Sequence, residues 1–216
     1  MSIPRVTIVI ASSLDGRIAF PEGGESHLGS EEDKRMLNNN LSMVDATIFG
    51  LGTLKAHQST YLIKNRCETN KEKISKSQPI SIVASNSKEF NSNWKYFRQP
   101  IRRWLISSSK VDNSSINDFE KQLFFENSWK KTLISLKKKG INDLALLGGA
   151  KLINSFSKED LITDIKITII PRIIGGKYTW IPPEQSNEIF NLKRLWEIKS
   201  IKNLMNNEIH IHYKKI

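Results

Sequence analysis

The sequence has a single cysteine, Cys67, and no long hydrophobic run. One cysteine excludes an internal disulfide and a cysteine metal cluster. Without a run of about 18 apolar residues, no membrane span is indicated. The first residues lead directly into an apolar strand and lack the basic, apolar and small-residue regions of a secretory signal. We therefore expect a cytoplasmic protein with no membrane contact.

Acidic residues are fewer than basic ones, 22 against 33, so the formal net charge is +11. Such a charge raises the possibility of nucleic-acid binding. The excess is mostly lysine scattered through the chain, without an arginine-rich arm or aromatic residues interleaved with basic ones. We interpret it as solvated surface and expect no nucleic-acid partner. A cationic surface still attracts anionic metabolites such as phosphorylated substrates.

The order of the apolar segments predicts one α/β domain. A chain of 216 residues suits a single domain, here 1–216, and no internal repeat or linker divides it. Helices are expected at about 30–43 and from 129 to 140, and residues 94–101 are ambiguous. Strands are expected at 6–11, 45–50, 79–84, 103–106, 144–147, 164–170, 195–201 and 208–213. Strands alternate with helices in the first part of the chain, whereas two strands follow each other directly at its end. This order indicates a mostly parallel sheet with an antiparallel C-terminal edge.

The most informative stretch runs from Leu144 to Ile153. Four apolar residues lead into Gly148-Gly149 and an amphipathic segment, a pattern that predicts a buried strand, a tight turn and the start of a helix. Glycine lets backbone N–H groups approach a ligand, and a helix N-terminus carries roughly +0.5 charge. Phosphate is the usual ligand of such a site. The full G-x-G-x-x-G pattern is absent, so a turn needed only for packing remains the alternative.

Five groups of segments, in order across about residues 5–176, extend this interpretation. They are Ala11–Ala19, Gly24–Ser26, Asp45–Thr53, Gly140–Asn142 with Leu147–Leu152, and Ile170–Gly176. Together they resemble the reductase domain of the RibD family, the riboflavin-pathway deaminase–reductases. The resemblance implies a dihydrofolate reductase-like three-layer α/β fold. The family's zinc deaminase half is not represented, because no H-x-E or C-x-x-C pattern occurs.

This resemblance implies NADPH-dependent hydride transfer to a ribosylamino-pyrimidine 5′-phosphate, the activity of a 5-amino-6-(5-phosphoribosylamino)uracil reductase. It also implies a homodimer. NADPH would lie along the carboxyl ends of the strands. The family's cofactor contacts fall on Ala11, Gly52, Thr53, Gly148, Gly149, Ala150, Lys151 and Leu152. Its substrate contacts fall on Ser26, His57 and Lys64.

The chain departs from the family pattern mainly on the substrate side. Leu28 replaces a tryptophan, Leu41 or a neighbour replaces an arginine, and His57 stands at an acidic position. Leu147 replaces the glutamate before the glycine pair. A leucine cannot hydrogen-bond a pyrimidine edge, so another residue does so or the substrate differs. The alternatives are a same-fold reductase of a pterin-like heterocycle and a cofactor-binding protein without turnover.

Three polar residues have both a functional and a structural interpretation. Asp15 could orient the substrate or relay a proton as a catalytic group, or simply form an Asp-Gly turn. Ser26 could bind substrate or cap its loop. His57 could contact a phosphate or act as an acid near neutral pH, or be a surface histidine.

Two further groups are interpreted as structural. His210 and His212 lie two apart on an expected strand and project from one face. A metal site needs a third ligand, which the sequence does not nominate, so we expect no metal. The carboxylates of Glu31, Glu32 and Asp33 follow Ser30 and are interpreted as complements to the helix dipole rather than as catalytic groups.

Overall fold

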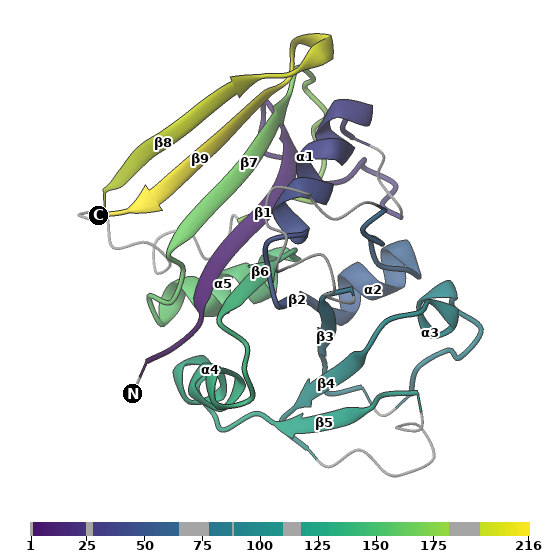
Figure 1. The fold of residues 1–216 in the computed structure, drawn as a ribbon. Coiled ribbons are helices and arrows are strands. Elements are labelled where there is room, and N and C mark those ends of the chain that lie inside the picture. The colour runs from purple at the N-terminus through teal and green to yellow at the C-terminus, as the bar shows by residue number, and fades with distance from the viewer. Residues whose placement is uncertain (1, 25–27, 65–77, 88, 110–117, 182–194) are drawn as a thin grey trace.

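A nine-stranded sheet forms the centre of the molecule (Figure 1). The computed structural model describes residues 2–24, 28–64, 78–87, 89–109, 118–181 and 195–216. Ser26 and Cys67 lie outside these ranges. The strands are β1 (Arg5–Ser13), β2 (Ala46–Gly50), β3 (Ile80–Ala84), β4 (Arg103–Ser107), β5 (Lys121–Phe124), β6 (Asp143–Leu146), β7 (Asp164–Ile170), β8 (Trp196–Asn203) and β9 (Ile209–Lys215). The helices are α1 (Glu31–Leu41), α2 (Leu51–His57), α3 (Lys95–Arg98), α4 (Trp129–Lys138) and α5 (Ala150–Lys158), with a 3₁₀ turn at Met205–Asn207.

The strand order β5-β4-β3-β2-β6-β1-β7-β9-β8 combines two kinds of pairing. Every pair from β5 to β7 is parallel. The pairs β7–β9 and β8–β9 are antiparallel. The predicted mostly parallel sheet with an antiparallel C-terminal edge is therefore confirmed.

Successive side chains of each strand point to opposite faces of the sheet, so the sheet has two apolar faces. Helices cover both faces. On β1, Ile8 packs in the cluster that contains Phe156 of α5. Its neighbour Val9 points to the opposite face and packs with Leu41 of α1. Further along that opposite face, a cluster joins β2, β3 and β4 to α2 and α3 through Phe49, Val83, Leu105, Leu54 and Tyr96. The result is the expected three-layer arrangement.

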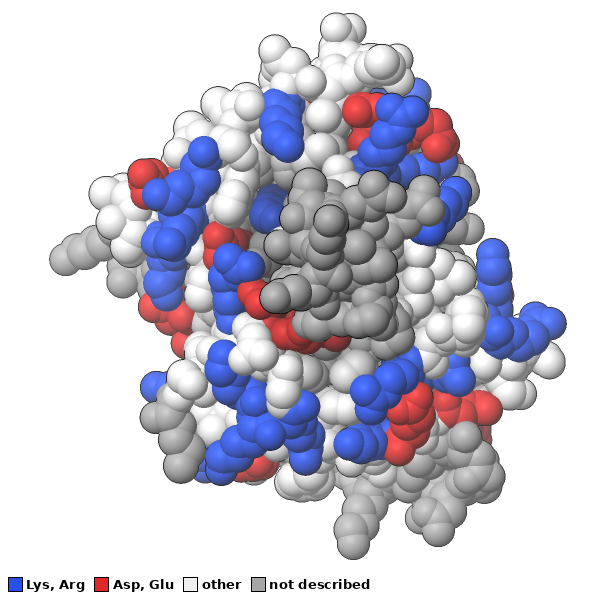
Figure 2. All heavy atoms as spheres, in the orientation of Figure 1, with Lys and Arg blue, Asp and Glu red and all other residues white. Residues whose placement is uncertain are grey.

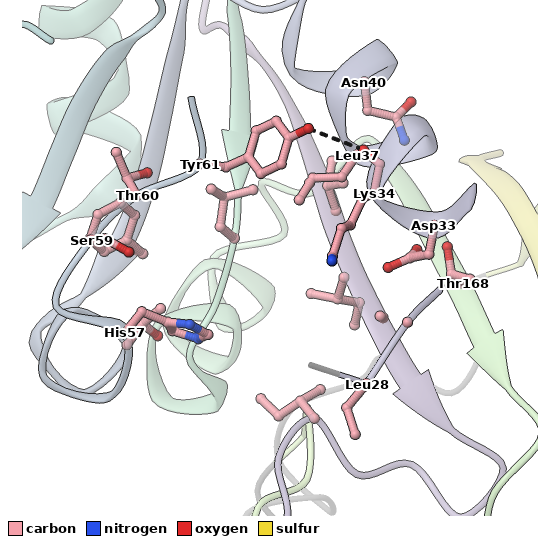
Figure 3. A pocket seen from close by; sticks show the side chains of 18 of the residues that line it. Leu28, Asp33, Lys34, Leu37, Asn40, His57, Ser59, Thr60, Tyr61 and Thr168 are labelled. Atoms are coloured by element: carbon pink, nitrogen blue, oxygen red, sulfur yellow. Dashed lines mark hydrogen bonds between the residues drawn. The ribbon is translucent and has the colours of Figure 1, made fainter. Parts of the chain in front are cut away.

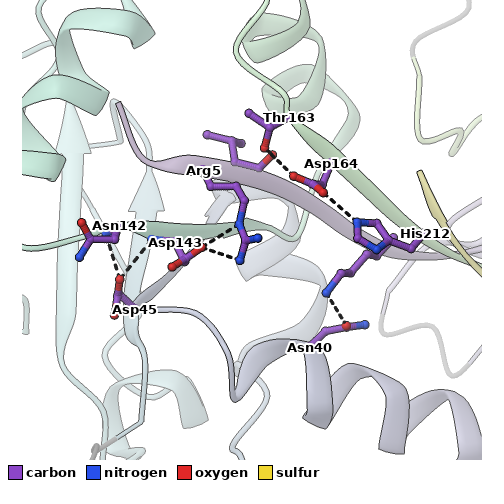
Figure 4. A network of polar contacts seen from close by, with 10 residues as sticks. Arg5, Asn40, Asp45, Asn142, Asp143, Thr163, Asp164 and His212 are labelled. Atoms are coloured by element: carbon purple, nitrogen blue, oxygen red, sulfur yellow. Dashed lines mark hydrogen bonds and ion pairs between the residues drawn. The ribbon is translucent and has the colours of Figure 1, made fainter. Parts of the chain in front are cut away.

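Polar contacts bind the amino ends of the central strands (Figure 4). Arg5 of β1 forms an ion pair of 2.7 Å with Asp143 of β6. The carboxylate of Asp45, just before β2, accepts the backbone N–H groups of Asn142 at 2.8 Å and Asp143 at 3.1 Å. These contacts hold three parallel strands in register at one edge and leave the carboxyl edge for ligands.

Three elements were not predicted from the sequence. The helix α2 begins directly at the end of β2, and α3 lies in the segment that the sequence left ambiguous. The short α3 is anchored by the fully buried Tyr96, whose hydroxyl lies 3.1 Å from the Ser81 Oγ atom. The strand β5 is an outer strand with partly exposed polar residues, so its apolar alternation is weak. Tertiary pairing with β4, rather than local pattern, fixes β5.

Lysine and arginine side chains are spread over the face of the molecule shown in Figure 2, with acidic residues between them. No continuous basic stripe crosses the described part of that face. In the described residues, no helix has the length and apolar character needed to cross a bilayer.

Candidate functional site

Two adjoining cavities open at the carboxyl ends of the parallel strands. The first has a volume of about 640 Å³ and the second about 970 Å³. Their linings share Ile18, Thr53, His57 and Gly149. The strand ends that line them include Ala11, Gly50, Ala84, Ile106 and Ser107. Open α/β sheets bind ligands at this edge, so the position alone marks a candidate site.

The glycine pair forms the boundary between the cavities. Gly148 has a φ of +109°, a conformation that favours glycine, and its carbonyl accepts the N–H of Gly50 at 3.1 Å. Gly149 is the N-cap of α5, and no side chain caps this helix. A Cβ atom at Gly149 would lie 3.4 Å from the Thr53 hydroxyl, so α2 and α5 meet here. The uncapped N–H groups can receive an anion at this point.

The second cavity has a positive lining. Lys151 and Lys177 line it, and no aspartate or glutamate is found among its described lining residues. Hydroxyl groups come from Ser85, Ser107 and Ser108. This combination of cations, hydroxyls and a helix N-terminus suits a ligand with several phosphate groups.

The first cavity is mixed in character. One side carries His57, Ser59 and Thr60, and Lys64 and Lys95 are also lining residues. Leu28, Leu37 and Leu147 supply apolar walls. Figure 3 shows His57, Ser59 and Thr60 across the cavity from Asp33 and Thr168. Such a cavity suits a flat ring with a phosphate at one end.

Asp33 is the residue that sequence analysis missed. It lies in the first turn of α1, but its carboxylate faces the cavity beside Thr168 of β7 (Figure 3). Burial raises the pKa of this carboxyl, the nearby Glu208 charge raises it further, and a hydrogen bond from the Thr168 hydroxyl opposes both. Asp33, Leu37 and Leu41 follow one another at intervals of four residues. This spacing places Asp33 on the inward face of α1 and was the available signal.

A buried glutamate positions the start of α1. The Glu208 carboxylate, before β9, accepts the Ser30 N–H at 2.8 Å and the Ser30 hydroxyl at 2.6 Å. The Ser30 oxygen in turn accepts the N–H groups of Glu32 and Asp33 as an N-cap. The helix is therefore tied to the C-terminal hairpin, and Asp33 is held near β7.

The two histidines of β9 have separate partners. The His210 Nδ1 atom lies 3.0 Å from the Thr168 hydroxyl, and the His212 Nε2 atom lies 2.7 Å from Asp164. Burial lowers the pKa of His210 to about 4, helped by the charges of Lys166 and Lys202, so this ring is neutral at pH 7. The described residues contain no group of three side chains suited to holding a metal ion.

His210 makes the stability of the protein depend on pH. Its folded pKa of about 4 lies below the ordinary value of 6.5, so the neutral ring stabilises the fold above pH 6.5. That contribution is lost as pH falls from 6.5 through 4. At about 1.4 kcal/mol per unit, we expect a loss of about 3 kcal/mol in the free energy of unfolding. Denaturant titrations of the protein and of His210→Gln at several pH values measure it. Parallel pH curves for the two proteins would contradict the assignment.

The cavities bring together most of the residues predicted for the site. Thr53, His57 and Gly149 line both cavities, and Ala11 and Lys64 line the first. Gly52, Ala150, Lys151 and Leu152 line the second. Gly148 lies in the turn behind them and is not a lining residue. Ser26 falls outside the described residues. The roles of all these residues stay predictions.

Asp15 is placed differently, because it lines neither cavity. Its carboxylate accepts the Ser13 hydroxyl at 2.5 Å and the N–H groups of Ile174 at 3.1 Å and Gly175 at 2.8 Å. These hydrogen bonds, the one from Ser13 foremost, hold the pKa of Asp15 at about 2. Asp15 thus ties the turn after β1 to the loop after β7. This geometry supports its structural role, and its catalytic role stays a prediction.

The fold and the paired cavities define an α/β domain of the dihydrofolate reductase-like class. Dihydrofolate reductase from Enterococcus faecalis superposes with a TM-score of 0.57 at 11% identity, over 98% of this chain and 96% of that one. The chain belongs to the RibD C-terminal domain family, whose family model matches residues 4–207. Acinetobacter baumannii RibD superposes with a TM-score of 0.81 at 20% identity, over 99% of this chain and 58% of that one.

Relatives in sequence fall into two groups. RibD of Buchnera aphidicola is 28% identical over 186 residues, which cover 81% of this chain and 50% of the relative. A protein of Archaeoglobus fulgidus named 2,5-diamino-6-ribosylamino-4(3H)-pyrimidinone 5′-phosphate reductase is 24% identical over 182 residues, covering 81% of this chain and 83% of the relative. The chain thus spans about half the length of the RibD relative and most of the second one.

Proposed function

We propose that the chain is an NADPH-dependent reductase of riboflavin biosynthesis. In this reaction hydride passes to the ribosylamino group of a pyrimidine 5′-phosphate, and the ribose becomes a ribityl chain. The observation that carries the proposal is the pair of cavities that meet at Thr53 and Gly149. One suits a nucleotide and the other a phosphorylated ring. The names of the relatives support the same chemistry.

The second cavity supports NADPH as the cofactor. The N-terminus of α5 and the Thr53 hydroxyl provide donors for the pyrophosphate. Lys151 and Lys177 offer cations for phosphate groups. An acidic residue that binds the ribose 2′-hydroxyl is typical of NAD sites, and no acidic residue occurs in the described lining. The cofactor supplies the hydride, and the protein positions the reactants and excludes water.

The first cavity supports a phosphorylated ring as the substrate. Lys64, Lys95 and His57 line it and can provide partners for the phosphate. Leu28 and Leu147 give apolar surfaces against which the pyrimidine packs. Since the cavities share Thr53, His57 and Gly149, the ribosylamino group of a substrate in the first cavity can meet a nicotinamide that enters from the second.

Titration with NADPH tests the cofactor assignment. Fluorescence of the dinucleotide should change saturably on binding. NADH should bind more weakly, because it lacks the 2′-phosphate that the lysines attract. Absence of saturable NADPH binding would remove the second cavity from the proposal. Binding without turnover of any pyrimidine would instead favour a cofactor-binding protein, an alternative consistent with Leu147, which cannot donate a proton next to the glycine pair.

We infer further that residues 1–216 act as one domain in the cytoplasm and as a homodimer. The outer strand β8 has a bulge between Ile198 and Ser200. Because of it, Ile198 and Ile201 pair with Tyr213 and Ile211, which are two residues apart and share a face of β9. The two isoleucines are 51% and 56% exposed, so an apolar stripe remains beyond the helices that cover the sheet.

We therefore expect a dimer mass by light scattering at micromolar concentration. Ile201→Lys should shift the protein toward the monomer, because a lysine in a buried apolar contact is unfavourable. The matched control is Lys199→Ala on the same strand. A monomer mass for the unmodified protein would contradict the inference.

A further inference from the structure

The first cavity distributes charge unequally. Lys34, Lys64 and Lys95 line it, and Asp33 is the one carboxylate in its described lining. Asp33 lies across the cavity from His57, which is near the junction with the second cavity (Figure 3). A ligand that complements these groups carries an anion for the lysines and hydrogen-bond donors for the Asp33 carboxylate. The proposed substrate has a phosphate at one end, so the question is which donors meet Asp33.

The Asp33 carboxylate is held in a defined position. The Thr168 hydroxyl hydrogen-bonds to it, and this hydroxyl also lies 3.0 Å from the neutral His210 ring. Gly29 lies against it, and a Cβ atom built on Gly29 would be 2.6 Å from the Asp33 Cβ atom. A side chain at position 29 would therefore displace Asp33. The absence of one leaves the space that the Asp33 carboxylate occupies in the cavity wall.

An unsatisfied donor lies two turns further along α1. Asn40 is 8% exposed and lines the same cavity. Its Oδ1 atom accepts a hydrogen bond of 3.0 Å from Lys166, which fixes the orientation of the amide. Its Nδ2 group has no partner among the described residues. That Nδ2 atom is itself buried, so Asn40 forms part of the cavity wall without presenting this donor to the cavity.

The pyrimidine rings that such a reductase can meet differ at position 2. A 2-amino-4(3H)-pyrimidinone presents two adjacent donors, the 2-amino group and N3–H, followed by the 4-carbonyl acceptor. A uracil presents a carbonyl acceptor on each side of N3–H. Two carboxylate oxygens match two adjacent donors, whereas a carboxylate facing uracil meets a carbonyl oxygen that repels it. Asp33 therefore discriminates between the two rings.

We propose that Asp33 is a substrate-recognition residue that selects a 2-amino-4(3H)-pyrimidinone ring over a uracil ring. The proposal rests on the proposed function and deepens it, because it names the pyrimidine ring that carries the ribosyl group to be reduced. The carboxylate accepts from the 2-amino group and N3–H. The product keeps the 2-amino group, so a deamination must follow reduction on the way to a 2-oxo ring.

The test compares two substrates that differ only at position 2, the 2-amino and the 2-oxo ribosylamino-pyrimidine 5′-phosphates, each with NADPH. We expect kcat/KM to be at least about a hundredfold higher for the 2-amino ring, a conservative figure beside the roughly 10⁴–10⁵ by which a site built for an N–H donor rejects an analogue without it. Equal values or a preference for the 2-oxo ring would overturn the proposal and leave the proposed function intact. No turnover of either ring, with NADPH bound, would overturn both.

Two variants assign the preference to Asp33. Asp33→Asn keeps the volume but offers one acceptor and one donor, a pair that matches N3–H and the 2-carbonyl of uracil. The ratio of kcat/KM values should fall at least about thirtyfold and approach or pass 1, while NADPH affinity stays unchanged. Gly29→Ala should lower the ratio in the same direction, because its Cβ atom displaces the carboxylate. Equal losses for both substrates would show that Asp33 does not recognise position 2 and would overturn the proposal.

Discussion

Gly149→Asp is expected to weaken NADPH binding at least a hundredfold. Gly149 caps α5 at the junction of the two cavities, next to the Thr53 hydroxyl. An aspartate here sets a negative charge against the cofactor phosphates. Two unit charges 4 Å apart repel by about 4 kcal/mol at an effective dielectric constant of 20, and part of this remains after screening. Fluorescence titration of the folded variant measures the dissociation constant.

A neutral variant separates charge from bulk in this experiment. Gly149→Asn adds nearly the same volume without a charge, so its loss of affinity should be clearly smaller and less sensitive to salt. Far-ultraviolet circular dichroism and the unfolding midpoint confirm that both variants fold. Unchanged NADPH affinity in a folded Gly149→Asp protein would place the cofactor away from the glycine pair.

Removing two lysines should weaken substrate binding about thirtyfold. Lys64 and Lys95 are exposed, and both line the first cavity. Each exposed contact with a phosphate contributes about 1 kcal/mol, so Lys64→Ala with Lys95→Ala loses about 2 kcal/mol. The effect should fall on KM more than on kcat, because the phosphate is remote from the reacting carbon. Initial rates with the phosphorylated substrate measure it.

The matched control replaces two exposed lysines of α4, Lys131 and Lys138, which do not line the cavity. That pair should leave KM unchanged. A second comparison uses the substrate without its phosphate, for which the Lys64 and Lys95 variants should behave like the unmodified protein. Equal losses with and without the phosphate would show that the two lysines do not bind it.

Those parts of the fold that depend on local pattern could be predicted from the sequence. The run from Leu144 to Leu147 forms the buried strand β6 and the turn that follows it. The glycine pair leads into α5 as expected, because the left-handed φ of Gly148 suits glycine. The antiparallel C-terminal edge followed from two strands without a helix between them. In contrast, β5 depends on pairing with β4, which no local pattern reveals.

The substrate side of the site could be predicted only in part. His57 and Lys64 lie in the first cavity, but Asp33 was interpreted as a dipole complement because it follows Ser30 and two other acidic residues. Its orientation depends on the missing side chain at Gly29 and on Thr168, which is distant in sequence. Leu28 and Leu147 line the cavity as apolar surface. The polar groups of Asp33 and Thr168, which line the same cavity, come instead from α1 and β7.

Single-turnover reduction of the 2-amino ribosylamino-pyrimidine 5′-phosphate tests the central proposal most directly. The protein is saturated with NADPH and mixed with the substrate, and the loss of absorbance of the reduced nicotinamide is followed in time. We predict stoichiometric oxidation of NADPH and a product two hydrogens heavier, with the ribose opened to a ribityl chain. Saturable binding of both ligands without NADPH oxidation would contradict the assignment of this chain as a reductase of that substrate.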